Sequence, residues 1–250
     1  MKSLIDGHLT VVSAREARRH VASATCGGGV FSTIGVQGGQ PLFVSDHVKR
    51  LRRESLLASL PQLPAATLRA AVAEVIRANR ALSCVIRLGW LAGGVARPFA
   101  LCEKARRTPG TIVLQVTHAV GPPLGRYAKS SHVFRWQSLR DQAARAGVFD
   151  LLVVREGRLT ETSRFNVFLE LDGRWCTPPD GEVFCGIARE SLLADDRTAT
   201  RVMPLDLSHL AASSRILLFN SVRGCLAVSR VLDSAGGTFW PPTLRRRSHT

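Results

Sequence analysis

The residues best suited to chemistry lie in one stretch of the chain, from Glu161 to Arg189. Glu161 is a carboxylate on an expected strand, and Gly186 stands where an expected helix begins, just before Ile187. A carboxylate can pair with a cation, and a helix N-terminus offers unpaired N–H groups and a positive dipole end to an anion. The stretch therefore suits a ligand with a cation at one end and an anion at the other.

Lys129 is the other candidate, because it stands just after the expected linker and upstream of Glu161, although a lysine is by default a surface charge. The sequence contains no HExxH or GxSxG motif and no dense cluster of His, Cys and Asp, so it predicts no metal site. Hydrolysis by a Ser/His/Asp triad stays open, although no serine stands in a nucleophile elbow. The six cysteines form no CxxC pair and are expected to be small buried residues in a reducing compartment.

Four motifs follow one another along the chain: GxGVFxT from Gly27, HxxRL from His47, ExSxxNVF…T…GIxR from Glu161, and NSxRG from Asn220. Together they resemble the motifs of the class IV aminotransferases. This pyridoxal-phosphate (PLP) family includes branched-chain and D-amino acid aminotransferases and 4-amino-4-deoxychorismate lyase, which the chain is most similar to in appearance. The resemblance covers nearly the whole chain.

The resemblance implies PLP as the cofactor and assigns roles to named residues. Lys129 would bind the cofactor covalently and then move the proton on the substrate Cα. Glu161 would pair with the pyridine nitrogen and keep it protonated, and Asn166 would support the strand of Glu161. The phosphate-binding groups would be the side chain of Arg50, the N–H of Ile187 and the hydroxyl and following N–H groups of Ser221.

Some residues depart from the family pattern. Gly28 and Ser32 stand where acidic residues are common, and His132 stands where the lyase branch often has Asn. Trp175 and Phe184 replace aliphatic residues, a change that keeps these positions apolar. The departures remove no implied cofactor contact, but they bear on which branch of the family the chain resembles.

Two reactions are compatible with this cofactor. We expect the lyase, which converts 4-amino-4-deoxychorismate to 4-aminobenzoate and pyruvate for folate synthesis, because the chain is short and carries the NSxRG motif. His132 and the altered first hairpin favour the alternative, an aminotransferase acting on D-, branched-chain or aromatic amino acids. A non-enzymatic basic scaffold or nucleic-acid binder is a third hypothesis, given a net charge of +15. Nucleic acid is the less favoured partner, because the few aromatic residues do not interleave with the basic ones.

The length of 250 residues allows one large domain or two modest ones. The segment 121–125, GPPLG, breaks all periodicity, so we expect an N-terminal domain at 1–118, a linker at 119–126 and a C-terminal domain at 127–250. The family implies an α/β (α+β) fold of PLP fold type IV, with a smaller N-terminal α/β domain, a larger C-terminal pseudo-barrel domain and a homodimer. No apolar run is long enough to span a membrane and no secretory signal is evident, which predicts a cytoplasmic protein.

The elements that must position these residues follow from periodicity and turn signals. Helices are expected at 47–60, 65–78, 133–146 and 187–194, and strands at 82–88, 99–101, 111–116, 150–154, 159–160, 167–169, 215–219 and 225–231. Gly38-Gly39 and Asp172-Gly173 are expected to be hairpin turns. The helix at 47–60 should bury Val48, Leu51 and the pair Leu56-Leu57, with its basic residues on the solvated side.

Overall fold

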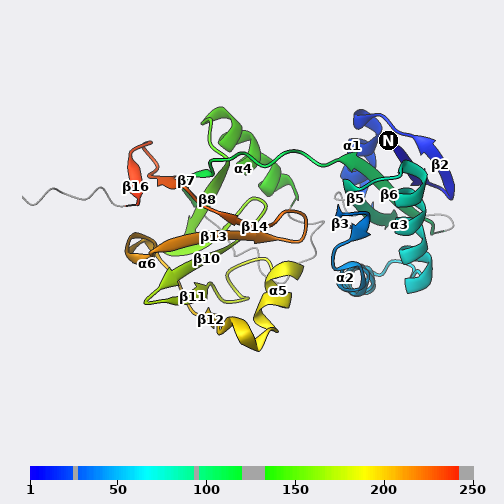
Figure 1. Ribbon diagram of the computed structural model, residues 1–250. Coiled ribbons are helices and arrows are strands. Elements are labelled where there is room, and N and C mark those ends of the chain that lie inside the picture. The colour runs from blue at the N-terminus through cyan, green and yellow to red at the C-terminus, as the bar shows by residue number, and fades with distance from the viewer. Residues whose placement is uncertain (25–27, 93–95, 120–132, 242–250) are drawn as a thin grey trace, which may run out of the picture. The chain divides into compact units, whose positions relative to one another are not determined.

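The computed structural model describes residues 1–24, 28–92, 96–119 and 133–241 (Figure 1). The chain divides into two compact units. The first unit comprises the described residues of 1–108 and 127–134 together with Ser221–Arg223, and the second comprises the described residues of 109–126, 135–220 and 224–250. The predicted nucleophile Lys129 lies outside the described residues.

The first unit is built on a six-stranded sheet with the order β2-β1-β6-β5-β3-β4. Its strands are β1 (Lys2–Ile5), β2 (His8–Val11), β3 (Gly29–Gln37), β4 (Gln40–Pro41), β5 (Ser83–Leu91) and β6 (Pro98–Lys104). The predicted hairpin at Gly38-Gly39 joins β3 to β4, and both glycines have the positive φ that such a turn requires, 56° and 77°.

Three helices cover the two faces of this sheet: α1 (Ala14–Ser23), α2 (Val44–Leu57) and α3 (Ala65–Asn79). Side chains alternate along a strand, so each strand can contribute to a core on either face. Ile34 and Leu88 pack with Leu51 of α2 and Val72 of α3 in the larger core. Phe31 belongs to a smaller cluster on the other face, which includes residues of α1.

The prediction for the apolar side of α2 was partly wrong. Val48 and Leu51 are buried, but Leu56 and Leu57 are 70% and 72% exposed. Residues 54–55 take the buried place instead, because a period of 3.6 brings 47–48, 51 and 54–55 to one face.

The second unit is built on a ten-stranded sheet with the order β12-β11-β10-β9-β8-β7-β15-β16, from which β13 and β14 branch at β10. Its strands are β7 (Val113–Ala119), β8 (Asp150–Arg155), β9 (Arg158–Thr162), β10 (Asn166–Leu171), β11 (Arg174–Thr177), β12 (Arg201–Val202), β13 (Arg215–Asn220), β14 (Gly224–Ala227), β15 (Arg230–Leu232) and β16 (Thr238–Trp240). Its helices are α4 (Val133–Arg145), α5 (Ile187–Leu193), α6 (Leu207–Ala212) and the 3₁₀ turn η3 (Asp196–Thr198).

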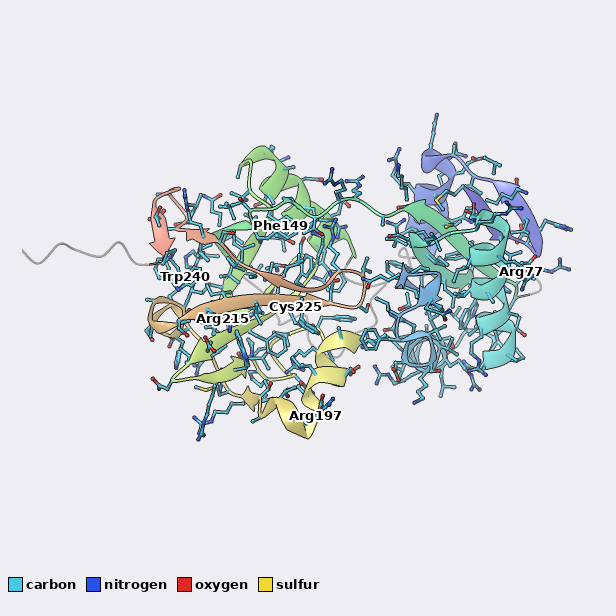
Figure 2. The ribbon with its side chains drawn as sticks, viewed as in Figure 1. Arg77, Phe149, Arg197, Arg215, Cys225 and Trp240 are labelled. Atoms are coloured by element: carbon cyan, nitrogen blue, oxygen red, sulfur yellow. The ribbon has the colours of Figure 1, made fainter. Side chains whose placement is uncertain are left out.

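One core lies inside this branched sheet, as in the pseudo-barrel that the resemblance implied. Leu152, Val167 and Leu218, from three different strands, are fully buried in it. Trp240 of β16 is buried at its edge and donates a hydrogen bond from Nε1 to the Ser213 carbonyl at 2.8 Å (Figure 2). The fold class is therefore the one expected, α/β.

Two strands differ from the expected organisation. β7 lies in the sheet of the second unit, because it pairs in parallel with β8 and β15. The strand expected at 225–231 is two strands, β14 beside β13 and β15 beside β7. Of the predicted linker, only Ala119 is described, and it ends β7. The predicted domain boundaries thus stay a prediction.

The burial of the cysteines and the length of the helices also bear on the expectations. Cys84, Cys102 and Cys176 are buried, whereas Cys225 on β14 is exposed (Figure 2). Among the helices of the described ranges, none is long and apolar enough to cross a membrane.

Candidate cofactor site

Glu161 and Asn166 lie side by side in the second unit. Glu161 is near the end of β9 and Asn166 begins β10, and the two residues pair directly across the antiparallel ladder. Each is only 5% exposed. The four residues between them form a tight turn, so the conformation of that turn decides how the two polar side chains are aligned.

The turn is held by Asp150, a fully buried carboxylate at the start of β8. Asp150 accepts hydrogen bonds from the Thr162 hydroxyl at 3.2 Å, the Ser163 N–H at 3.3 Å and Arg164 Nε at 2.9 Å. A buried carboxylate is costly unless it is bonded in this way. Asp150 therefore fixes the turn between Glu161 and Asn166.

The backbone of Phe184 is held by both of these residues. Its N–H donates to Glu161 Oε1 at 3.0 Å, and its carbonyl accepts from Asn166 Nδ2 at 2.8 Å. Its ring meets the buried ring of Trp136 on α4 edge to face, with 5.4 Å between centroids. Phe184 thus links the carboxylate of β9 to the helix that follows Gly186.

Gly186 stands at the N-cap of α5 and packs tightly against Asn166. A Cβ at Gly186 would lie 2.2 Å from Asn166 Oδ1, so no larger residue fits without displacement. The first backbone bond of the helix runs from the Glu190 N–H to the Gly186 carbonyl at 2.8 Å. The Ile187 N–H precedes that bond, in the turn whose N–H groups have no partner within the helix. The structure therefore brings Glu161 and Ile187 onto one connected framework.

Arg189 of α5 anchors the start of the same loop. Its side chain is fully buried and donates from Nη1 to Asp180 Oδ1 at 2.6 Å and from Nη2 to the Pro178 carbonyl at 2.7 Å. Arg189 therefore ties the first turn of α5 to the segment that leaves β11.

The ionisation of Glu161 is governed by its burial. Burial raises the pKa of the carboxyl from its ordinary value of 4.5 to about 8. The Phe184 N–H and the charges of Arg155 and Arg189 oppose this rise, since each stabilises the carboxylate. The site is thus arranged so that the carboxylate gains most from a cationic partner.

The other two predicted cofactor residues belong to the first unit. Arg50 is 7% exposed, unlike the exposed Lys49, Arg52 and Arg53 of the same helix. One turn earlier on its buried side, His47 Nδ1 lies 2.7 Å from the hydroxyl of Ser32 on β3. Arg50 is therefore set apart from the solvated basic side of α2.

Ser221 lies against β3 of the first unit at a close approach of two backbones. A Cβ at Gly35 would lie 2.9 Å from the Ser221 carbonyl oxygen, so only glycine allows this approach. Arg223 then donates from Nη1 to the Thr108 hydroxyl at 2.9 Å. Arg50 and Ser221 are thus described within one unit, and Glu161 and Ile187 within the other.

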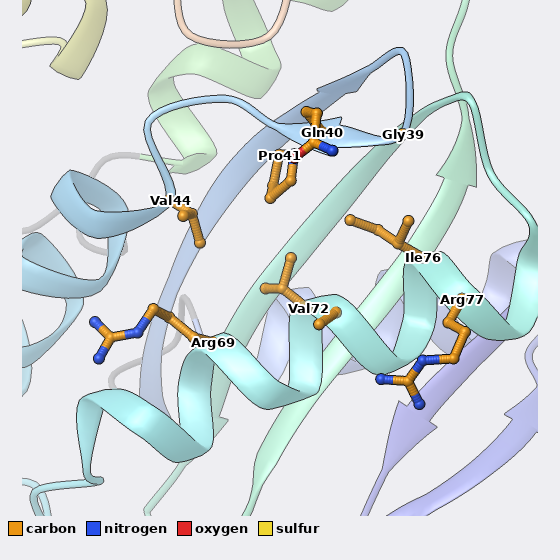
Figure 3. Close-up of a pocket in the computed structure, with 9 residues that line it drawn as sticks. Gly39, Gln40, Pro41, Val44, Arg69, Val72, Ile76 and Arg77 are labelled. Atoms are coloured by element: carbon orange, nitrogen blue, oxygen red, sulfur yellow. The ribbon is translucent and has the colours of Figure 1, made fainter.

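A separate groove of about 270 Å³ lies in the first unit (Figure 3). Val72 and Ile76 of α3 line it together with Pro41 and Val44. It contains none of the residues that match the four sequence motifs, so it has no part in the cofactor site.

A family comparison decides the classification. The amino-transferase class IV family matches residues 29–231, which is most of the chain. The chain belongs to the class IV aminotransferases. It is therefore a PLP-dependent enzyme of this family, which confirms the cofactor that the resemblance implied. A comparison of the sequence with curated proteins finds no match.

Solved structures of other proteins share the fold of this class IV chain. A fold IV transaminase, CpuTA1 from Curtobacterium pusillum, is 23% identical, with a TM-score of 0.74 over 90% of this chain and 86% of that one. A hypothetical aminotransferase from Mycobacterium tuberculosis in its PLP-bound form is 20% identical, with a TM-score of 0.76 over 96% and 93%. A Legionella pneumophila protein assigned as a 4-amino-4-deoxychorismate lyase is 20% identical, with a TM-score of 0.75 over 88% of each chain.

The residues of this class IV chain fit the cofactor's ring nitrogen. Within the part of the chain that is described, the one hydrogen bond to the Glu161 carboxyl comes from the Phe184 N–H. Ser163 Oγ, in a residue only 5% exposed, has no hydrogen-bond partner among the same residues. Burial disfavours the ionised form of this carboxyl until a cation binds next to it. Such a carboxyl is suited to pair with a pyridinium.

The motifs missed the residues that position this site. The Phe184 contribution is a backbone N–H, which no side-chain pattern can reveal. Asp150 has only a weak sequence signal, an acid at the first position of a strand whose next four residues are apolar.

Proposed function

We propose that this class IV enzyme is a lyase that converts 4-amino-4-deoxychorismate to 4-aminobenzoate and pyruvate. The observation that carries the cofactor half of the proposal is the buried Glu161 carboxyl, held by the Phe184 N–H at 3.0 Å beside the start of α5. The likeness over 88% of each chain to the Legionella protein assigned as this lyase supports the reaction.

Glu161 would bind the pyridine nitrogen of the cofactor and hold a proton there. Its raised pKa of about 8 means that the carboxyl is protonated at neutral pH before a cation is bound, so it carries the proton that the nitrogen needs. When bound, PLP supplies an electron sink that lets a bond next to the substrate amino group break. Asn166 keeps the carboxylate in place through the Phe184 carbonyl.

The guanidinium of Arg50, the N–H of Ile187 and the hydroxyl of Ser221 would supply the hydrogen-bond donors for the phosphate of the cofactor. Arg50 supplies a fork of donors, and Ile187 supplies an N–H from the first turn of α5. Lys129 would hold the cofactor covalently and would take the proton from the substrate carbon that carries the amino group.

The lyase reaction balances without a second substrate. Lys129 removes the proton, the bond from the ring carbon to the ether oxygen breaks, and the departing enol takes up a proton to become pyruvate. The two products together contain every atom of the substrate. An aminotransferase, in contrast, requires a keto acid to receive the amino group.

This difference makes the test direct. Purified enzyme with PLP is incubated with 4-amino-4-deoxychorismate and no keto acid, and 4-aminobenzoate is measured by chromatography. We expect product from the wild type and a loss of at least about 10³-fold for Lys129→Ala, since the acid–base group is removed. Failure of the wild type to form 4-aminobenzoate would exclude the lyase.

Amino transfer is the second candidate. A structure of the Mycobacterium tuberculosis aminotransferase with α-ketoglutarate and PMP bound matches with a TM-score of 0.76 over 92% of this chain. Under this alternative, the enzyme would move the amino group of a D-, branched-chain or aromatic amino acid to a keto acid. Amino transfer that depends on the keto acid, without 4-aminobenzoate formation, would decide for it.

We further propose that the enzyme acts as a homodimer in the cytoplasm. Light scattering tests the first of these points, since a dimer has twice the 27.2 kDa mass of one chain.

A further inference from the structure

The segment between β11 and α5 carries the Phe184 N–H, so its position decides how Glu161 is bonded. Its beginning is fixed where the Thr177 hydroxyl donates to the Val167 carbonyl at 2.9 Å. Its end is fixed at Gly186, where the close approach of Asn166 leaves no room for a side chain. Between these points, residues 178–185 form no helix or strand. We call residues 178–186 the connecting loop.

Arg189 is the residue that anchors this loop from α5. Its guanidinium is fully buried and spans two acceptors of the loop, the Pro178 carbonyl and the Asp180 carboxylate. Asp180 itself is 52% exposed, so the anchor joins a buried cation to a solvated anion. A planar fork with several donors can hold two acceptors at once, which an ammonium group does less well.

Arg189 also acts on Glu161 through space. Its positive charge is among those that stabilise the Glu161 carboxylate, together with that of Arg155. The hydrogen bonds of Arg189 to the loop and its positive charge therefore have the same effect. Both favour the ionised carboxylate of Glu161, which is the form that binds a cation.

We propose that Arg189 is a positioning residue, which holds the connecting loop so that the Phe184 N–H stays bonded to Glu161 and which thereby sets how tightly the enzyme binds PLP. This proposal rests on the proposed contact between Glu161 and the pyridine nitrogen. Arg189 touches neither the cofactor nor the substrate in this account.

Three variants separate the anchor from the charge. Arg189→Met removes both, Arg189→Lys keeps the charge but loses the fork, and Asp180→Asn weakens one of the two loop contacts without emptying a buried position. Asp195→Asn is the matched control. Asp195 pairs with Arg197, which is 89% exposed beyond the end of α5 (Figure 2). If Arg189→Met does not fold, the other two substitutions carry the test.

Two measurements are made on each variant and on Glu161→Gln. The dissociation constant for PLP comes from absorbance titration, and the exchange rate of the Phe184 amide hydrogen is measured in the cofactor-free protein. We expect Arg189→Met to weaken PLP binding about tenfold or more, and Asp180→Asn about threefold, because a hydrogen bond to a charged group is lost or loosened. Amide exchange should accelerate in the same order, with Arg189→Lys intermediate and Asp195→Asn unchanged.

The pH profile provides a readout that a purely structural role would not move. In cofactor-free Arg189→Met, the pH at which Glu161 ionises should lie above that of the wild type. PLP binding and exchange at wild-type levels in all three variants would overturn the proposal, provided that Glu161→Gln weakens PLP binding. Unchanged binding in Glu161→Gln would instead overturn the proposed cofactor contact, and with it the effect of Arg189 on binding.

Discussion

Burial determines the behaviour of Glu161 at the scale of single residues. The carboxyl is 5% exposed and receives one hydrogen bond from Phe184 within the described ranges, which is too little to compensate for the loss of water. Its pKa is therefore raised to about 8. The folded cofactor-free protein prefers the protonated carboxyl, whereas the unfolded chain ionises it near 4.5.

A pH dependence of stability follows from this difference. The contribution of Glu161 is fully present below about pH 4.5 and is lost as the pH rises through about 8. Because each tenfold change in acid dissociation corresponds to about 1.4 kcal/mol, full ionisation costs on the order of 5 kcal/mol. Glu161→Gln should remove this part of the pH dependence when cofactor-free protein is unfolded with urea at pH 5.5 and pH 8.5, as test conditions.

The control for this experiment is Glu156→Gln, on an exposed turn between β8 and β9. It should retain the wild-type difference between the two pH values. An equal pH dependence in Glu161→Gln and the wild type would contradict the account of the buried carboxyl.

Gly186 provides a second prediction at this scale. Gly186→Ala places a Cβ 2.2 Å from Asn166 Oδ1, so Asn166 or the loop must move. We expect a loss of about 1–3 kcal/mol in the free energy of unfolding and weaker PLP binding. Gly181→Ala, in the same loop, meets nothing within 4 Å and should leave both quantities near their wild-type values. Urea unfolding and PLP titration of the two variants check this.

Sequence motifs predicted part of this arrangement at the residue scale. They selected Glu161 and Asn166, whose side chains bond to the Phe184 backbone. They also selected Gly186, whose lack of a side chain allows the close approach of Asn166. They also selected Arg50, yet composition alone suggested a solvated basic face of α2, and only the packing of α2 on its sheet separates Arg50 from Arg52. The hydrogen bonds that join Phe184 to Glu161 and Asn166 are made by the Phe184 backbone, so they could not be predicted from its side chain.

At the scale of elements, local sequence signals were sufficient to predict the short hairpin turns. Gly38-Gly39 and Asp172-Gly173 adopt the positive φ values that their hairpins need. The helix α1 was missed although Ser13 and Glu16 form a capping box, because its residues are mostly polar and exposed. The division of 225–231 into β14 and β15 depends on partners more than a hundred residues away in one case, which local patterns do not contain.

Asp150 gives the prediction that belongs to this scale. It joins the start of β8 to the turn between β9 and β10, through Thr162, Ser163 and Arg164. Asp150→Ala should cost about 3 kcal/mol in the free energy of unfolding, because it leaves buried donors without their acceptor. PLP binding should weaken as well, since the alignment of β9 with β10 is loosened.

The control is Asp141→Ala, at an exposed position of α4 where the carboxylate accepts only from Gln137 among the described residues. Its stability should change by less than about 0.5 kcal/mol. Equal effects of the two substitutions in urea unfolding would show that the Asp150 bonds contribute little.

The whole molecule consists of two units, each with its own core, and the four motifs are divided between them. GxGVFxT and HxxRL lie in the first unit, whereas the stretch from Glu161 lies in the second. Composition and length allowed two domains, but they could not assign β7, because its parallel partners β8 and β15 follow it in the chain.

One measurement tests the central claim, that this chain binds PLP through Lys129 and uses it. The protein is loaded with PLP, reduced with borohydride and digested, and the modified peptide is identified by mass spectrometry. The sequence has only three other lysines, Lys2, Lys49 and Lys104, so the assignment is unambiguous. We expect the modification on Lys129 alone, and its loss in Lys129→Ala. Modification of another lysine, or none in a protein that folds, would contradict the account.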